Sequence, residues 1–183
     1  RDATGIRIGM IFILVSALLF IPFTAVFTQI IAKIEGGAGP LAYSALMGGF
    51  ANVILTFYPA IWWMTAAFRP DRAPELIYLL NDMCWLQWLG GLTILLGMQF
   101  AVIGAAFFDK NATPVFPRWF GYFNLCAIAI MAPDQLLFFF HTGPFSWSGI
   151  FGLWLPAGMF FLWFLTTFFF LRRAILRDRV PRA

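Results

Sequence analysis

The chain has few of the residues that build metal and redox centres. It holds one histidine, His141, and two cysteines, Cys84 and Cys126. One histidine is too few for a bis-histidine haem or for the histidine-rich dicopper and di-iron centres of membrane oxygenases. Paired-cysteine metal motifs, phosphate-binding glycine loops and nucleophile elbows are also missing from the sequence. We therefore expect no metal and no cofactor, and we favour a protein that is not an enzyme.

Charged residues are scarce as well, at 11% of 183 residues. Soluble domains hold about 25%. Hydrophobic residues make up 62% of the chain and include 24 Phe and 8 Trp, more than a water-soluble fold of this size can bury. The net charge of +4 does not predict a nucleic-acid partner, because the basic residues gather at the carboxyl end, where they suit a membrane anchor. This group comprises Arg172, Arg173, Arg177, Arg179 and Arg182.

Five long apolar runs fill most of the chain. A helix needs about 20 consecutive apolar residues to cross a bilayer, and each run is long enough. We therefore predict an all-α integral membrane protein, a single helical bundle over residues 1–183 with a basic cytoplasmic tail at 172–183. The chain begins with Arg1 rather than methionine, which leaves open a sixth helix or a signal sequence upstream. The predicted spans are 6–32, 41–68, 76–108, 116–140 and 147–171.

The third run is too long for one straight span. With Glu75 included it covers about 34 residues, or roughly 50 Å at 1.5 Å per residue, against a bilayer core of about 30 Å. It must protrude, tilt strongly or break, and Gly90-Gly91 is the expected break point. The other four spans each carry an internal proline, for which we expect kinks that help packing, with a functional hinge as the alternative. These are Pro22, Pro59, Pro133 and Pro156.

Small residues recur at a spacing of four on two of the runs. Ser44 and Gly48 share a face of the second span, and Gly97, Ala101 and Ala105 share a face of the third. Small side chains at this spacing let membrane helices approach closely.

Lysine and arginine counts predict the orientation. With the carboxyl end in the cytoplasm, the inner side holds Lys33, Lys110, Arg118 and the arginines of the tail, and the outer side holds fewer basic residues. We therefore expect a multi-pass protein of the bacterial inner membrane with a cytoplasmic carboxyl terminus. The outer basic residues are Arg1, Arg7, Arg69 and Arg72.

Ionisable residues inside a membrane are functional candidates by default. Asp82 and Asp134 lie in spans that run in opposite directions, at an expected depth of about 10 Å below the outer boundary. Tyr78, Asp82 and Trp85 share a helix face, and so do Asp134 and His141 at a spacing of seven. The remaining candidates near this level are Asn81, Gln135, Tyr58 and Arg7.

Three interpretations of these residues stay open. In the first, Asp82 or Asp134 pairs with Arg7, Arg69 or Arg72 and holds the helices together. In the second, the polar groups line an outward-facing pocket in which two close carboxylates share a proton. In the third, Asp134 and His141 form the acid–base pair of a lipid-modifying enzyme.

Three stretches of the sequence stand out together. They carry Arg-Pro-Asp-Arg-Ala-Pro-Glu at 69–75 with Asn-Asp and Trp following at 81–85, Phe-Pro-Arg-Trp-Phe-Gly-Tyr at 116–122, and Thr-Gly-Pro-Phe-Ser-Trp at 142–147. Together they resemble a family of uncharacterised bacterial multi-spanning membrane proteins. The resemblance implies an architecture with one more amino-terminal span and implies no activity.

Missing catalytic motifs and bare apolar faces favour a non-enzymatic function. We expect an accessory subunit of a membrane complex, or a binding module for an apolar ligand or lipid. Its partners would be membrane lipids and another membrane protein or a second copy, without nucleic acid. A small proton-coupled transporter built on Asp82 and Asp134 is the alternative, and a lipid-modifying enzyme is the third possibility.

Overall fold

The computed structural model describes residues 3–69, 71–91 and 96–178. Arg1, the last arginines of the tail and part of the third predicted span, 92–95, lie outside the described residues. The described residues form helices and no strand, which confirms the predicted all-α bundle. The helices are α1 (Ala3–Glu35), α2 (Pro40–Phe68), α3 (Pro74–Gly90), α4 (Leu96–Phe108), α5 (Arg118–Met131), a 3-10 segment η2 (Ala132–Phe138), a π-helical turn η3 (Ile150–Trp154) and α6 (Leu155–Asp178).

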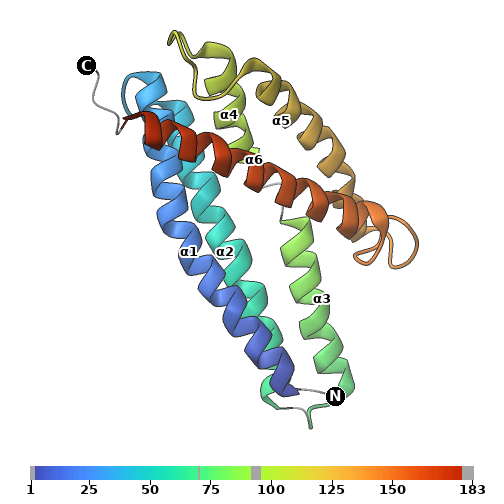
Figure 1. Cartoon of the computed structure of the whole chain (residues 1–183). Helices are drawn as coiled ribbons and strands as arrows, with labels where there is room; N and C mark the ends of the chain where they lie inside the picture. The colour runs from blue at the N-terminus through green and yellow to red at the C-terminus, as the bar shows by residue number, and fades with distance from the viewer. Residues whose placement is uncertain (1–2, 70, 92–95, 179–183) are drawn as a thin grey trace.

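Helices α1 and α2 form a long antiparallel hairpin (Figure 1). Gly36 makes the turn at a positive φ of 81°, which glycine adopts without steric cost. The Glu35 carboxylate accepts hydrogen bonds from the backbone N–H groups of Leu41, at 3.1 Å, and Ala42, at 2.7 Å. A carboxylate at these free N–H groups complements the positive end of the α2 dipole. The end of α1 thereby caps the start of α2.

The third predicted span is divided at the expected place. Helix α3 ends at Gly90, and α4 begins at Leu96. Gly90 lies against the ring of Phe138, and Gly91 lies against Leu55, so neither position has room for a side chain without a shift of its neighbour. Of the three outcomes left open for this run, the break is the one the structure shows.

Four helical stretches among the described residues are long and apolar enough to cross a membrane, and they correspond to four of the five predicted spans. They are Ala3–Glu35, Pro40–Phe68, Arg118–Phe138 and Ile150–Arg177. The two halves of the third span have only 17 and 13 residues. With the divided third span between them, these helices are those of a membrane-embedded multi-pass protein.

The last two predicted spans have other limits than we expected. Helix α5 tightens into η2 at Pro133, whose ring removes a helical hydrogen bond, and η2 ends at Phe138. Helix α6 begins only at Leu155, and it continues through the predicted start of the tail to Asp178. The described part of the basic tail is therefore helical.

The small residues predicted to bring helices together do so between α2 and α4. A side chain built on Gly97 would stand 3.0 Å from the Ser44 carbonyl oxygen and 3.3 Å from the Gly48 Cα. Ala101 and Ala105 have no exposed surface. Close backbone approach through small residues is typical of membrane helices.

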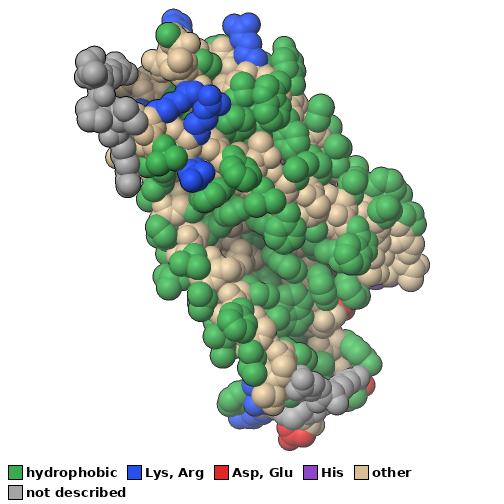
Figure 2. All heavy atoms as spheres, viewed as in Figure 1, with side chains coloured by type: hydrophobic (Ala, Val, Ile, Leu, Met, Phe, Trp, Pro, Cys, Tyr) green, Lys and Arg blue, Asp and Glu red, His purple; other side chains and the backbone are tan. Residues whose placement is uncertain are grey.

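On the face shown in Figure 2, most charged side chains lie towards the two ends of the molecule, with a largely apolar surface between them. The α1–α2 turn, the α4–α5 connection and the end of α6 share one end, and the start of α1 and the α2–α3 turn share the other (Figure 1). Large apolar side chains such as Phe12 and Phe169 are exposed over 70% and 63% of their surface. Hydrocarbon would cover such a band in a bilayer.

Candidate binding cavity

A cavity of about 630 Å³ lies between the α1–α2 hairpin, the carboxyl end of α3 and helix α6. Sites for small molecules commonly measure about 300–1,000 Å³. Helix α6 crosses the front of the bundle obliquely (Figure 1), and Figure 2 shows the surface hollowed between α6 and α1. The lining residues are Ile13, Ser16, Leu19 and Phe20 from α1, Asn52 and Thr56 from α2, Trp88 and Leu89 from α3, Leu153 from η3, and Ala157, Phe160, Phe161 and Phe164 from α6.

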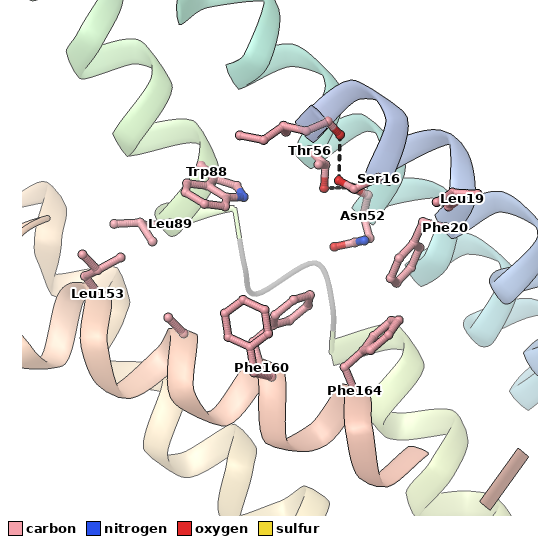
Figure 3. Close-up of a pocket in the computed structure, with 13 residues that line it drawn as sticks. Ser16, Leu19, Phe20, Asn52, Thr56, Trp88, Leu89, Leu153, Phe160 and Phe164 are labelled. Carbon is pink, nitrogen blue, oxygen red and sulfur yellow. Dashed lines mark hydrogen bonds between the residues drawn. The ribbon is translucent and has the colours of Figure 1, made fainter. Parts of the chain in front are cut away.

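Most of the cavity wall is apolar and aromatic. Trp88 lies on the α3 side, and Phe160 and Phe164 extend from α6 across from the hairpin (Figure 3). The rings of Phe20 and Phe164 are 5.7 Å apart, so they link α1 to α6 at one edge of the cavity. None of the described lining residues carries a charge. The wall suits a neutral, largely apolar molecule.

Three polar side chains lie together on the hairpin wall (Figure 3). The Ser16 hydroxyl donates to the Ile13 carbonyl at 2.7 Å, and the Thr56 hydroxyl donates to the Asn52 carbonyl at 2.9 Å. The Asn52 side chain is buried, with 4% of its surface exposed, and it has no hydrogen bond to any described residue. It is thus a buried polar group that faces an apolar cavity without a partner.

Asp134 is fully buried in η2, outside this cavity. Its Oδ1 accepts a hydrogen bond from Gln135 Nε2 at 2.8 Å, and its Oδ2 has no described partner. Gln135 Nε2 also donates to the Gly90 carbonyl oxygen at 2.9 Å. Gln135 therefore links η2 to the carboxyl end of α3.

Asp82 is exposed and does not meet Asp134. The η2 segment packs at Gly90, which is eight residues beyond Asp82 on α3, or about 12 Å along the helix axis. The expectation that both carboxylates lie at one depth is therefore wrong, because the span that holds Asp134 ends partway along α3 instead of reaching its start (Figure 1). Tyr78, one turn before Asp82, is also exposed.

The arginines expected to neutralise these carboxylates do not reach them among the described residues. Arg7 donates to the backbone carbonyls of Ala67, at 2.7 Å, and Phe68, at 3.4 Å. This contact holds the start of α1 to the end of α2. The predicted ion pair from Arg7, Arg69 or Arg72 to either aspartate is absent from this part of the chain.

The remaining predicted site residues serve packing or lie on the surface. Asn81 accepts a hydrogen bond from Trp63 Nε1 at 3.3 Å, and Trp85 stacks on Trp147 with ring centroids 4.8 Å apart. Tyr58 is exposed, and its ring contacts the neighbouring Phe57. None of these three lines the cavity.

Asp134 and His141 do not share a helix face. The helix that holds Asp134 ends at Phe138, and His141 is exposed in the connection that follows. The predicted spacing argument required a continuous helix, which η2 does not provide. Within the described ranges, no three His, Cys, Asp or Glu side chains gather as metal ligands would.

The cavity could not be predicted from the sequence. Asn52 meets the same criterion that selected Asp82, a polar side chain in the middle of an apolar run. Trp88 and the α6 phenylalanines gave no comparable signal, since aromatic residues occur throughout the chain.

Comparison of the chain with protein-family models, with curated proteins and with solved structures finds no match.

Proposed function

We propose that this multi-pass protein is a non-enzymatic binding module for an apolar ligand taken from the bilayer. The cavity beside α6 is the observation that supports this proposal most strongly, because its volume and its uncharged aromatic wall suit such a molecule. Leu19 and Phe161 line it and are each exposed over 64% of their surface. A rim of this kind gives lipid-soluble molecules a direct entry from the hydrocarbon.

We further propose the bacterial inner membrane as the location, with the carboxyl end of α6 in the cytoplasm. The end of the molecule that holds this terminus also carries Lys33, Lys110 and Arg118. The opposite end holds Arg7, Arg69 and Arg72, fewer than the first end once the arginines of α6 are included. This asymmetry has the sense of the positive-inside rule. The resemblance to multi-spanning bacterial proteins agrees with this location.

Adjacent positions on α6 provide a matched test of the proposal. Ala157 lines the cavity, whereas a Cβ added at Gly158 meets nothing within 4 Å. The Ala157→Leu variant should fill part of the cavity, and the Gly158→Leu variant should not. We expect native purification in mild detergent, followed by mass spectrometry, to show a lipophilic molecule whose occupancy falls severalfold in Ala157→Leu alone.

Equal occupancy in both variants and in the unchanged protein would contradict the proposal. A membrane protein that co-purifies in stoichiometric amount, without any lipophilic molecule, would support the accessory-subunit alternative instead.

Proton-coupled transport remains a second candidate, on one observation. Asp134 is fully buried, and one of its carboxylate oxygens has no described partner, which is the environment of a proton-carrying group. The candidate now rests on Asp134 alone, since Asp82 lies elsewhere.

A further inference from the structure

The unpaired Asn52 amide gives the cavity a chemical preference. Its side chain extends from α2 into the cavity (Figure 3), with 4% of its surface exposed. Either orientation of the amide presents two N–H bonds and one oxygen to the same space. Buried N–H groups in proteins nearly always have a partner, and leaving one unpaired costs about 1–3 kcal/mol. An occupant of the cavity that accepts a hydrogen bond would remove this cost.

A second unpaired donor faces the same space from α3. The indole nitrogen of Trp88 points into the cavity (Figure 3), and no described residue accepts its hydrogen. Indole can only donate, so it also needs an acceptor. The Ser16 and Thr56 hydroxyls already donate to backbone carbonyls. The unpaired donors of the cavity, Asn52 Nδ2 on the hairpin side and Trp88 Nε1 on the α3 side, therefore each need an acceptor oxygen.

The shape of the wall favours a flat ring. Phe160 and Phe164 present aromatic rings across from the hairpin, and Phe20 closes the edge next to them (Figure 3). Aromatic side chains pack well against the face of a planar ring system. A bicyclic ring with a short apolar tail fits within about 630 Å³.

We propose that the ligand is a lipid-soluble ring compound with carbonyl oxygens, such as a quinone, which accepts hydrogen bonds from Asn52 Nδ2 and Trp88 Nε1. This inference rests on the proposed binding function and specifies its ligand class. The carbonyl oxygens satisfy both donors, the ring lies among the phenylalanines, and the tail extends to the exposed rim at Leu19 and Phe161.

A matched pair of probes tests the ligand class. The probes are 2-methyl-1,4-naphthoquinone and 2-methylnaphthalene, which share a bicyclic carbon skeleton and differ in the two carbonyl groups. Each is titrated into the full chain in nanodiscs, and uptake by empty nanodiscs is subtracted. We expect the quinone to bind about 3- to 10-fold more tightly than the hydrocarbon, as one or two hydrogen bonds would give.

Side-chain variants test which groups supply the preference. In Asn52→Leu, and to a smaller extent in Trp88→Phe, the ratio of quinone affinity to hydrocarbon affinity should fall towards one. Binding of the hydrocarbon itself should persist in both variants. Thr56→Val is the control, because it removes a hydroxyl from the same wall that already donates to the backbone. If Asn52→Leu does not fold, the comparison in the unchanged protein and in Trp88→Phe still decides the question.

Equal affinity for the two probes in the unchanged protein would overturn this inference and leave the proposed function standing. A quinone preference that survives both Asn52→Leu and Trp88→Phe would also overturn it. If neither probe binds and no lipophilic molecule co-purifies, the proposed function falls as well.

Discussion

Asp134 and Gln135 are a pair of adjacent side chains that link η2 to the carboxyl end of α3. Gln135 Nε2 donates both to Asp134 Oδ1, at 2.8 Å, and to the Gly90 carbonyl, at 2.9 Å. Both N–H bonds of one amide are thereby used. The second carboxylate oxygen of Asp134 has no partner among the described residues, and an ionised carboxylate is costly in such a place. A neutral side chain of the same shape should therefore be tolerated at this position.

We predict that Asp134→Asn still folds, with the free energy of unfolding lowered by about 1–3 kcal/mol at most, because its amide N–H groups replace a buried oxygen that has no described partner. The amide oxygen can still accept from Gln135, and no charge has to be buried. Because Asp134 does not line the cavity, the variant should also keep the lipophilic molecule. Thermal unfolding in detergent and mass spectrometry of the purified protein measure the two effects.

Transport assays decide the competing interpretation of Asp134. If a pH gradient drives uptake into liposomes, and Asp134→Asn abolishes it while the exposed Asp82→Asn leaves it intact, the protein is a proton-coupled carrier. Asp82→Asn is a suitable control because it makes the same chemical change about 12 Å further along α3.

Residue chemistry alone predicted the site incompletely. The rule that polar groups in apolar runs are functional selected Asp134, which is buried, and equally Asp82, which is exposed. The same rule did not select Asn52, because the importance of this residue depends on the cavity beside it. Relative depth could be calculated from the sequence only by assuming that neighbouring spans end at the same level, whereas the span of Asp134 ends partway along α3 (Figure 1).

At the scale of helices, the contact of α2 with α4 depends on the absence of side chains. A Cβ on Gly97 would stand 3.0 Å from the Ser44 carbonyl oxygen, which is backbone and cannot rotate away. Ala101, one turn further along α4, is completely buried. The two helices are held at a separation that only the smallest residues permit.

We predict that Gly97→Leu lowers the free energy of unfolding by about 1–3 kcal/mol, because the added side chain must push α4 away from α2. Gly9→Leu is the matched control, since a Cβ at Gly9 on α1 meets nothing within 4 Å. Unfolding in mixed micelles measures both variants. Equal stability of the two would show that α2 and α4 are not in close contact.

Element identity was predictable from the length of the apolar runs, and the break at Gly90-Gly91 was predictable from run length and glycine content. The residues at which the helices end were less predictable from the sequence. Apolar residues continue past Phe138, but the helix does not, because Pro133 changes its pitch and the connection 139–149 turns the chain. The oblique course of α6 creates the cavity. This course results from the packing of α6 against several helices, so the apolar sequence of α6 alone does not determine it.

At the scale of the whole molecule, the alternation of helices assigns each turn to one of two ends (Figure 1). The α1–α2 turn and the α4–α5 connection lie at the same end, and the α2–α3 turn lies at the other. Apolar surface separates the ends (Figure 2). A bilayer around this surface would keep the two sets of turns on opposite sides.

Cysteine labelling should detect this separation. In a background with Cys84→Ser and Cys126→Ser, single cysteines are placed at Ala38, Ala112 or Ala73, all of which are exposed. We expect a membrane-impermeant maleimide to label Ala73→Cys on intact cells, and to label Ala38→Cys and Ala112→Cys only after lysis. Labelling of all three from one side would contradict the arrangement of the helices. The reversed pattern would invert the proposed orientation and preserve the fold.

The break between α3 and α4 also bears on the order in which the protein is assembled. Neither half, with 17 and 13 residues, reaches the length of about 20 that a self-sufficient span requires. The Gly90 carbonyl finds its partner in Gln135, 45 residues later in the chain. During synthesis, the contact between Gly90 and Gln135 therefore cannot form until the ribosome has delivered η2, and a nascent chain halted earlier would lack this link between α3 and η2.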